Sequence, residues 1–112
     1  MVAMSQIEEL GRQIGREFHP ERVVLFVSHV HGVPTDESDV DLLIILEFDG
    51  RSVDQSVQIR MKLRPAFPLD LLVRTPETVR ERLALGDDFM REILAEGKLL
   101  YDAACPSKLG RL

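Results

Sequence analysis

Cysteine, tyrosine and tryptophan are scarce in this chain, which has one cysteine, one tyrosine and no tryptophan among its 112 residues. The lone Cys105 excludes an intramolecular disulfide framework and a cysteine-based zinc site. The 14 basic side chains are outnumbered by 19 acidic ones, and they do not cluster with aromatic residues. A track for a nucleic acid needs such clusters, so we expect no nucleic-acid partner.

The chain also lacks a long hydrophobic run. Even the longest runs, such as Leu42–Leu46, are far too short to cross a bilayer, which takes about 20 apolar residues. The first ten residues do not show the charged-then-apolar profile of a signal peptide. We therefore expect a cytoplasmic location and no membrane partner.

What the chain does contain is typical of a globular domain. Hydrophobic residues make up 45% and charged residues 29% of the sequence, which suits a packed core with a solvated surface. The length allows one core and not two. We expect one folded domain over residues 1–102, followed by a weakly ordered tail over 103–112.

Hydrophobic periodicity predicts an alternation of helices and strands. Ser52 with Gln55 fits a capping box at one helix start, and Thr75 before Pro76 fits an N-cap at another. The expected helices are 5–18, 52–63, 76–84 and 87–96, and the expected strands are 22–27, 40–46, 67–73 and a short 98–101. This order predicts an α/β (α+β) fold, with helices packed on a small mixed sheet.

Three aspartates interrupt or border the apolar strands. Asp39 and Asp41 are two positions apart, so strand geometry sends both side chains to one face, with Cβ atoms roughly 6–7 Å apart. Asp70 lies in the middle of the next expected strand, which could bring it to the same point. Buried carboxylates are costly unless they are paired or bind a metal. Three together form a hard oxygen site for Mg²⁺ or Mn²⁺, which points to phosphoryl or nucleotidyl transfer.

Each aspartate also has a purely structural interpretation. Asp39 could end a turn with Ser38, and Asp70 could form an ion pair with Arg64 or Arg74. The D-x-D pattern with a third aspartate in the following strand favours metal binding over these alternatives.

The motifs resemble a known family. "FVSHVHG…SDVDLLIIL", then "PLDLLV" and "REILAEGKLLYD", are similar to the minimal nucleotidyltransferases of the DNA polymerase β-like superfamily. These are small bacterial and archaeal proteins often encoded beside a HEPN-domain partner. The resemblance runs from about Val23 to Asp102, and it implies the polymerase β-like nucleotidyltransferase fold.

Position by position, the resemblance implies a two-metal site. Asp39, Asp41 and Asp70 fall on the catalytic and metal-binding carboxylates, which would hold Mg²⁺ or Mn²⁺ against ATP. Ser28 falls on the family serine that would hold the β- and γ-phosphates. Val27 replaces the glycine that precedes this serine in the family, and a branched side chain there would narrow the phosphate cradle.

Other residues near these motifs have more than one interpretation. His29 and His31 could contact phosphate or could be exposed loop residues. They could also belong to a zinc site, but no further His or Cys lies nearby in the sequence to complete it. Arg60, Lys62 and Arg64 could contact phosphate or form a solvated helix face.

Two functions follow from the resemblance. In the first, the chain is a Mg²⁺-dependent enzyme that transfers AMP from ATP to a hydroxyl of a HEPN-type toxin and so acts as an antitoxin. In the second, Val27 marks a degenerate transferase that binds and neutralises its partner without chemistry. The sequence leaves open a homodimer.

Overall fold

The computed structural model describes residues 4–26, 40–65 and 69–103. Each expected helix and strand is present in the expected order. The elements are α1 (Met4–Phe18), β1 (Arg22–Phe26), β2 (Val40–Ile45), α2 (Ser52–Leu63), β3 (Leu69–Arg74), α3 (Pro76–Ala84), α4 (Asp88–Glu96) and β4 (Lys98–Asp102).

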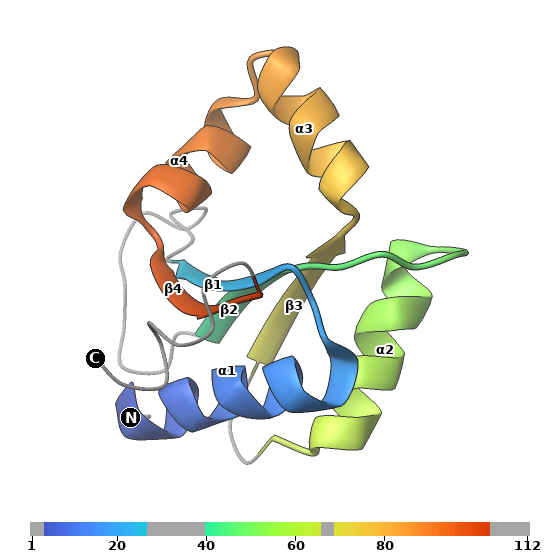
Figure 1. Ribbon diagram of the computed structural model, residues 1–112, viewed down its shortest axis with the longest axis vertical. Helices are drawn as coiled ribbons and strands as arrows, with labels where there is room; N and C mark the ends of the chain where they lie inside the picture. The colour runs from blue at the N-terminus through green and yellow to red at the C-terminus, as the bar shows by residue number, and fades with distance from the viewer. Residues whose placement is uncertain (1–3, 27–39, 66–68, 104–112) are drawn as a thin grey trace.

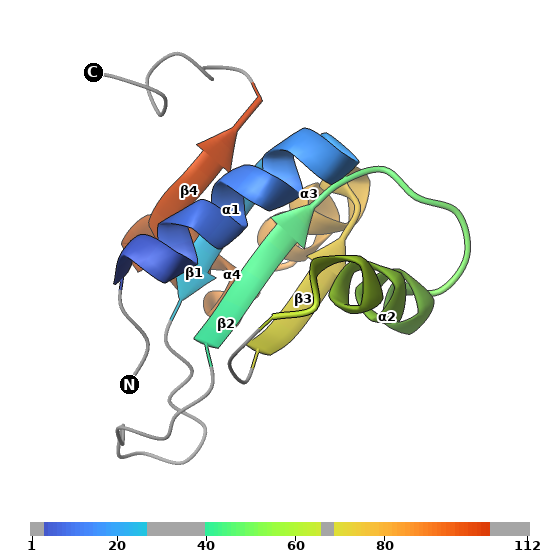
Figure 2. The same ribbon diagram turned by 90° about the horizontal axis from the view of Figure 1, so that it is seen from below.

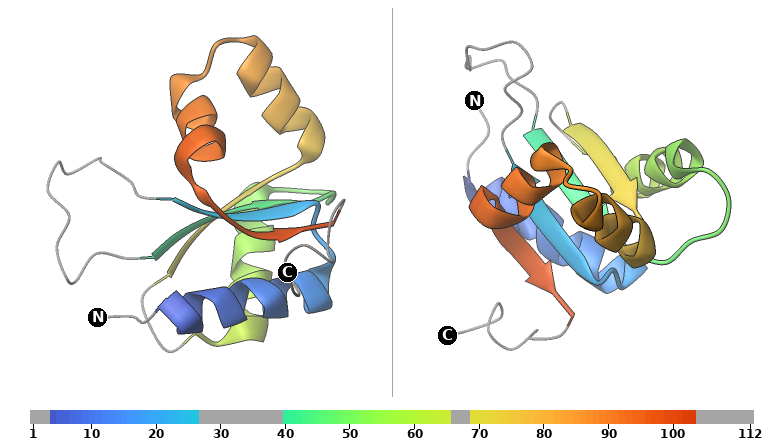
Figure 3. Two further views of the ribbon diagram at one scale, coloured as in Figure 1. Left: turned by 60° about the vertical axis from the view of Figure 1, so that its left-hand side comes forward. Right: turned by 90° about the horizontal axis from the view of Figure 1, so that it is seen from above.

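The strands form a mixed sheet in the order β3-β2-β1-β4. β1 is antiparallel to both β2 and β4, whereas β2 and β3 are parallel and are joined through α2. Figure 1 shows α1 and α2 on one side of the sheet and α3 and α4 on the other, and the left view of Figure 3 shows the same layers. The predicted fold class, helices on a small mixed sheet, is confirmed.

Alternation along each strand divides the core between the two faces. Leu42 and Ile44 of β2 belong to the cluster that also contains Ile14 of α1 and Ile59 of α2. The intervening β2 residues belong to a second cluster with α3 and α4, made of Val24, Leu43, Ile45, Val79, Met90 and Ile93. Because β2 is covered on both faces, it is nearly all apolar, as expected for a central strand.

Helix α1 lies close over β4 (Figure 2) because two of its glycines leave room for the strand. A Cβ placed on Gly11 would lie 2.7 Å from Cβ of Leu100, and one on Gly15 would meet the ring of Tyr101. Both glycines are buried. The contact therefore depends on the absence of side chains at these two positions.

The outer edge of β3 is covered by side chains from α2. The carbonyl of Arg74 accepts from the backbone N–H of Leu46, so alternate carbonyls, including those of Leu69 and Val73, point to the outer edge. Nη2 of Arg60 donates to the Leu69 carbonyl at 2.6 Å, and Oγ of Ser52 donates to that of Val73 at 2.6 Å. This hydrogen bonding occupies an edge that would otherwise be open to another strand.

The contact of Ser52 corrects the capping box expected at the start of α2. The N-cap is Arg51, which makes no side-chain capping hydrogen bond, and Ser52 is the first residue of the helix. The Ser52 hydroxyl is engaged with the edge of β3 instead. The tertiary contact has overridden the local pattern.

Side-chain caps begin α3 and α4. Oγ1 of Thr75 accepts from the backbone N–H of Thr78 at 3.1 Å, as the sequence predicts. Oδ1 of Asp87 accepts from the backbone N–H of Met90 at 3.1 Å. This bond and the Arg82 guanidinium, whose Nε lies 2.9 Å from the carboxylate, lower the pKa of Asp87.

In the described part of the chain, no helix has the length and apolar character needed to span a membrane.

Candidate functional site

Two of the three predicted carboxylates lie side by side on neighbouring strands. Asp41 is the second residue of β2, and Asp70 is the second residue of β3. The two are partners in the parallel register of these strands. Because register partners in adjacent strands point to the same face, both side chains project from one side of the sheet.

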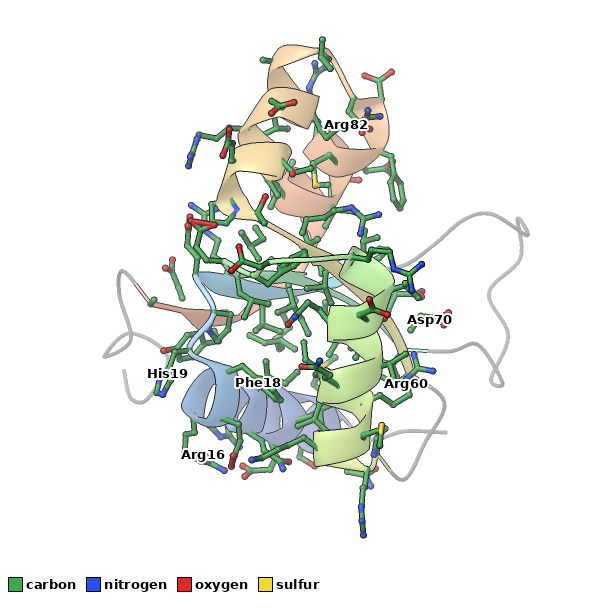
Figure 4. All side chains as sticks on the ribbon, turned by 90° about the vertical axis from the view of Figure 1, so that its right-hand side faces the viewer. Arg16, Phe18, His19, Arg60, Asp70 and Arg82 are labelled. Atoms are coloured by element: carbon green, nitrogen blue, oxygen red, sulfur yellow. The ribbon has the colours of Figure 1, made fainter. Side chains whose placement is uncertain are left out.

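The face that carries them is the one covered by α3 and α4. Asp41 shares its face with Leu43 and Ile45, both of which pack in the α3–α4 cluster. Asp70 shares its face with Leu72, which packs against the same cluster. Figure 4 shows Asp70 beside the sheet, with Arg60 of α2 below it. The carboxylates thus lie at one end of the sheet, beyond the apolar contacts of the helices.

The exposure of Asp70 corrects the expectation that it is enclosed in the middle of an apolar strand. β3 begins at Leu69, so Asp70 is near the start of the strand, and its side chain is exposed. Asp41 is half-buried and already takes part in an interaction. The cost of an enclosed carboxylate therefore does not apply to Asp70, and its position at an accessible strand end suits ligand binding.

The ion pairs that would give Asp70 a purely structural role are not formed. Nη1 of Arg74 donates to Oγ of Ser52 and to the Val73 carbonyl, each at 2.8 Å. Arg64 ends α2 in the left-handed conformation, with φ 47°. Within the described ranges, neither arginine pairs with Asp70.

Several predicted site residues lie outside the described residues. They are Val27, Ser28, His29, His31 and Asp39. The described ranges contain no cluster of three His, Cys, Asp or Glu side chains able to hold a metal ion, and the third member of the predicted triad, Asp39, is outside those ranges. The roles of these residues remain predictions.

Of the basic residues considered for phosphate contact, two have other contacts. Arg60 binds the Leu69 carbonyl through Nη2, and Nζ of Lys62 lies 3.5 Å from Oε1 of Glu17 in α1. Both arise from α2, which packs on the face opposite to Asp41 and Asp70. The structure therefore favours a structural role for Arg60 and a solvated helix face for Lys62.

An aromatic pair beside the carboxylates was not singled out from the sequence. Phe26 ends β1 and is the register partner of Asp41. Its ring meets that of Phe89 in α4 edge-on, with centroids 5.9 Å apart and planes at 82°. Phe89 is one of several apolar residues on an amphipathic helix, so its sequence position did not distinguish it from core residues such as Met90.

The donor set fits a divalent metal ion. Asp41 and Asp70 supply carboxylate oxygens, which are the ligands that Mg²⁺ and Mn²⁺ prefer. Two carboxylates in register on adjacent strands repel each other, and a bound cation would reduce this repulsion. Their placement therefore suits a site that binds positive charge.

Comparison with known proteins defines the class. A family model described as "Polymerase beta, Nucleotidyltransferase" matches residues 8–104, and the chain therefore belongs to this family. A protein of Methanocaldococcus jannaschii named "putative protein adenylyltransferase" is 28% identical over 83 residues, which are 72% of this chain and 78% of the relative.

A solved structure shares the fold. The crystal structure of a protein from Sulfolobus solfataricus, named a "putative nucleotidyltransferase", superposes with a TM-score of 0.58 at 16% sequence identity. The match covers 90% of this chain and 81% of that one. The mixed sheet with helices on both faces is thus a nucleotidyltransferase fold.

Proposed function

We propose that this chain transfers AMP from ATP to a hydroxyl group of a partner protein, with Mg²⁺ held by Asp41 and Asp70. The observation that carries the proposal is the register pairing of these two aspartates on one face of the sheet. Family membership supports nucleotidyl transfer, and the name of the M. jannaschii relative supports a protein as acceptor.

In this proposal, some of the site residues bind the metal ion and the nucleotide, and one of them accepts a proton. Asp41 and Asp70 would hold the cation, with Asp39 as the predicted third ligand, and Ser28 is the predicted contact to the β- and γ-phosphates. The bound ion would supply charge neutralisation at the α-phosphate. Asp70 is exposed and can accept the proton of the attacking hydroxyl. A bond then forms between the acceptor oxygen and the α-phosphorus, and pyrophosphate leaves.

We further propose a HEPN-domain toxin as the acceptor, with this chain as its antitoxin. This proposal is supported by the resemblance of the motifs to the minimal nucleotidyltransferases, which are often encoded beside a HEPN-domain protein.

The experiment uses the purified chain, the protein encoded beside its gene, Mg²⁺ and ATP labelled either at the α- or at the γ-phosphate. Label from the α-position on the neighbouring protein, and none from the γ-position, is expected. Asp41→Asn and Asp70→Asn should each reduce transfer by roughly 100-fold or more. Glu47→Gln, an exposed acid beyond the other end of β2, is the matched control.

A second candidate function is a binding subunit without catalysis, which Val27 favours. A tight complex that acquires no label, even after Val27→Gly, would establish this alternative and exclude the enzyme. Activity that arises only after Val27→Gly would identify a transferase disabled by the valine.

A further inference from the structure

We propose that Phe26 and Phe89 form a stacking site for the base of a nucleotide whose phosphates are held at Asp41 and Asp70. This inference rests on the proposed nucleotidyl transfer and adds the site that receives the base. It concerns a pair of side chains that neither the family match nor the relatives assign.

The first observation is the exposure of the aromatic residue Phe89. Two core residues of α4, Met90 and Ile93, are each 3% exposed. Phe89 is 47% exposed although its ring packs edge-on against Phe26. An exposed aromatic surface of this kind provides a flat apolar area for a planar ligand.

The second observation is the place of the pair relative to the carboxylates. Phe26, Asp41 and Asp70 are register partners in a row across β1, β2 and β3. Neighbouring strands lie about 4.8 Å apart, so the backbone of Phe26 is one strand spacing from that of Asp41. Phe26 packs with the α3–α4 cluster, which places it on the carboxylate face. A nucleotide lying along this row would have its phosphates at the aspartates and its base towards the rings.

The third observation is that α4 is held firmly in position. Asp87 caps its first turn, and Gly97 ends it against β1. A Cβ on Gly97 would lie 2.5 Å from Cγ1 of Val24 and 2.8 Å from the Leu25 carbonyl oxygen. Such close approach fixes the helix over β1, and with it the position of Phe89. A stacking surface that is already in place loses little entropy when the ligand binds.

The apolar, aromatic character of Phe26 and Phe89 predicts which nucleotide bases bind best. The hydrophobic cluster against which Phe26 packs includes Val24, Leu43 and Met90. Stacking depends on ring area and does not read hydrogen bonds at the edge of the base. We therefore expect purine nucleotides to bind more tightly than pyrimidine nucleotides, with little discrimination between adenine and guanine at this surface.

The test measures binding rather than turnover. Calorimetric titration with Mg²⁺ compares the dissociation constants of α,β-methylene-ATP, which cannot transfer AMP, and of inorganic tripolyphosphate, which has no base. Phe89→Leu keeps an apolar side chain but removes the ring, and it should weaken binding of the ATP analogue roughly 5- to 150-fold. Tripolyphosphate binding should not change, and Phe89→Trp should retain the affinity of the wild type.

The control variant is Leu85→Ala, in the turn between α3 and α4, where Leu85 is 76% exposed. It should leave both dissociation constants unchanged. Unchanged affinity of Phe89→Leu for the ATP analogue would overturn the stacking site. An equal loss of affinity for tripolyphosphate would also overturn it, as would a variant that differs from the wild type only in self-association.

The same titration separates this inference from the proposed function. Asp70→Asn should weaken binding of both ligands, because both carry the phosphates. If Asp70→Asn does so while Phe89→Leu has no effect, the nucleotide site stands and the stacking site is wrong. Failure of the wild-type chain to bind either ligand would contradict the proposed function, and the stacking site with it.

Discussion

At the scale of single residues, the Asp41–Asp70 pair places two like charges side by side at the proposed metal site. Like charges that face each other across neighbouring strands destabilise a sheet. The sequence made this pair visible because a charge in an apolar strand stands out against its neighbours. It did not reveal Phe89, because an apolar residue at helical spacing has the same pattern whether it is buried or half-exposed.

We predict that Asp70→Asn removes the response of the protein to Mg²⁺ without weakening the fold. In EDTA, relief of repulsion from Asp41 should leave the free energy of unfolding unchanged or raise it by about 0.2–1 kcal/mol. Mg²⁺ should raise the melting temperature of the wild type but not that of the variant. Thermal unfolding with and without Mg²⁺ measures both effects, with Glu47→Gln as control. A variant that still responds to Mg²⁺ would place the ion elsewhere.

Gly15→Ala provides a second test at the residue scale. In an open helix this change would stabilise by about 1 kcal/mol. Here the added Cβ would meet the Tyr101 ring, so we expect a loss of about 1–3 kcal/mol from overpacking. Denaturant unfolding measures the change. In a Tyr101→Ala background the penalty should largely disappear. Destabilisation that persists there would show that contact with the ring is not its cause.

At the scale of secondary-structure elements, local signals predicted where helices begin and end better than they predicted side-chain contacts. Thr75 caps α3 as its sequence indicates, because an N-cap needs only neighbours in the chain. Ser52 offered a similar signal but bonds to Val73, 21 residues away. Such a contact depends on how α2 crosses β3, which no local pattern encodes.

The cap of α4 should give stability a specific dependence on pH. The Met90 N–H, with a further contribution from Arg82, holds the pKa of Asp87 below its ordinary value. This stabilisation is present above the unfolded-state pKa, about 3.9, and is lost as the pH falls through the lower folded-state pKa. Asp87→Asn should therefore lower the melting temperature at pH 6 and have a diminishing effect below about pH 4.

Thermal unfolding across this pH range checks the prediction, with Asp88→Asn as the matched control because the Asp88 side chain is 93% exposed. An effect of Asp87→Asn that stays constant down to pH 2 would show that the charge of Asp87 does not contribute.

The edge of β3 gives a further prediction at this scale. Arg60→Ala leaves the Leu69 carbonyl without its side-chain donor, so we expect a loss of about 0.5–1.5 kcal/mol. We also expect more self-association at high concentration, because an uncovered edge can pair with another strand. Denaturant unfolding and sedimentation velocity measure the two effects. Met61→Ala, one residue on and 70% exposed, should show neither. Equal behaviour of both variants would contradict the role of Arg60.

At the scale of the whole molecule, the order of elements and the mixed sheet could be predicted from the sequence, because alternating periodicities specify both. The register could not. Which residue of β3 lies beside Asp41 depends on the path of the connection through α2, and a shift of one residue would send Asp70 to the opposite face. The observed register places the two carboxylates together, and the proposed metal site depends on this placement.

The most direct test of that account is a crystal structure of the protein with Mn²⁺ and α,β-methylene-ATP, with anomalous scattering used to locate the metal. We predict a manganese peak bonded to one carboxylate oxygen of Asp41 and one of Asp70, each at about 2.1 Å, with the nucleotide phosphates completing its coordination. A nucleotide bound away from both aspartates, or manganese ligated by neither, would contradict the account.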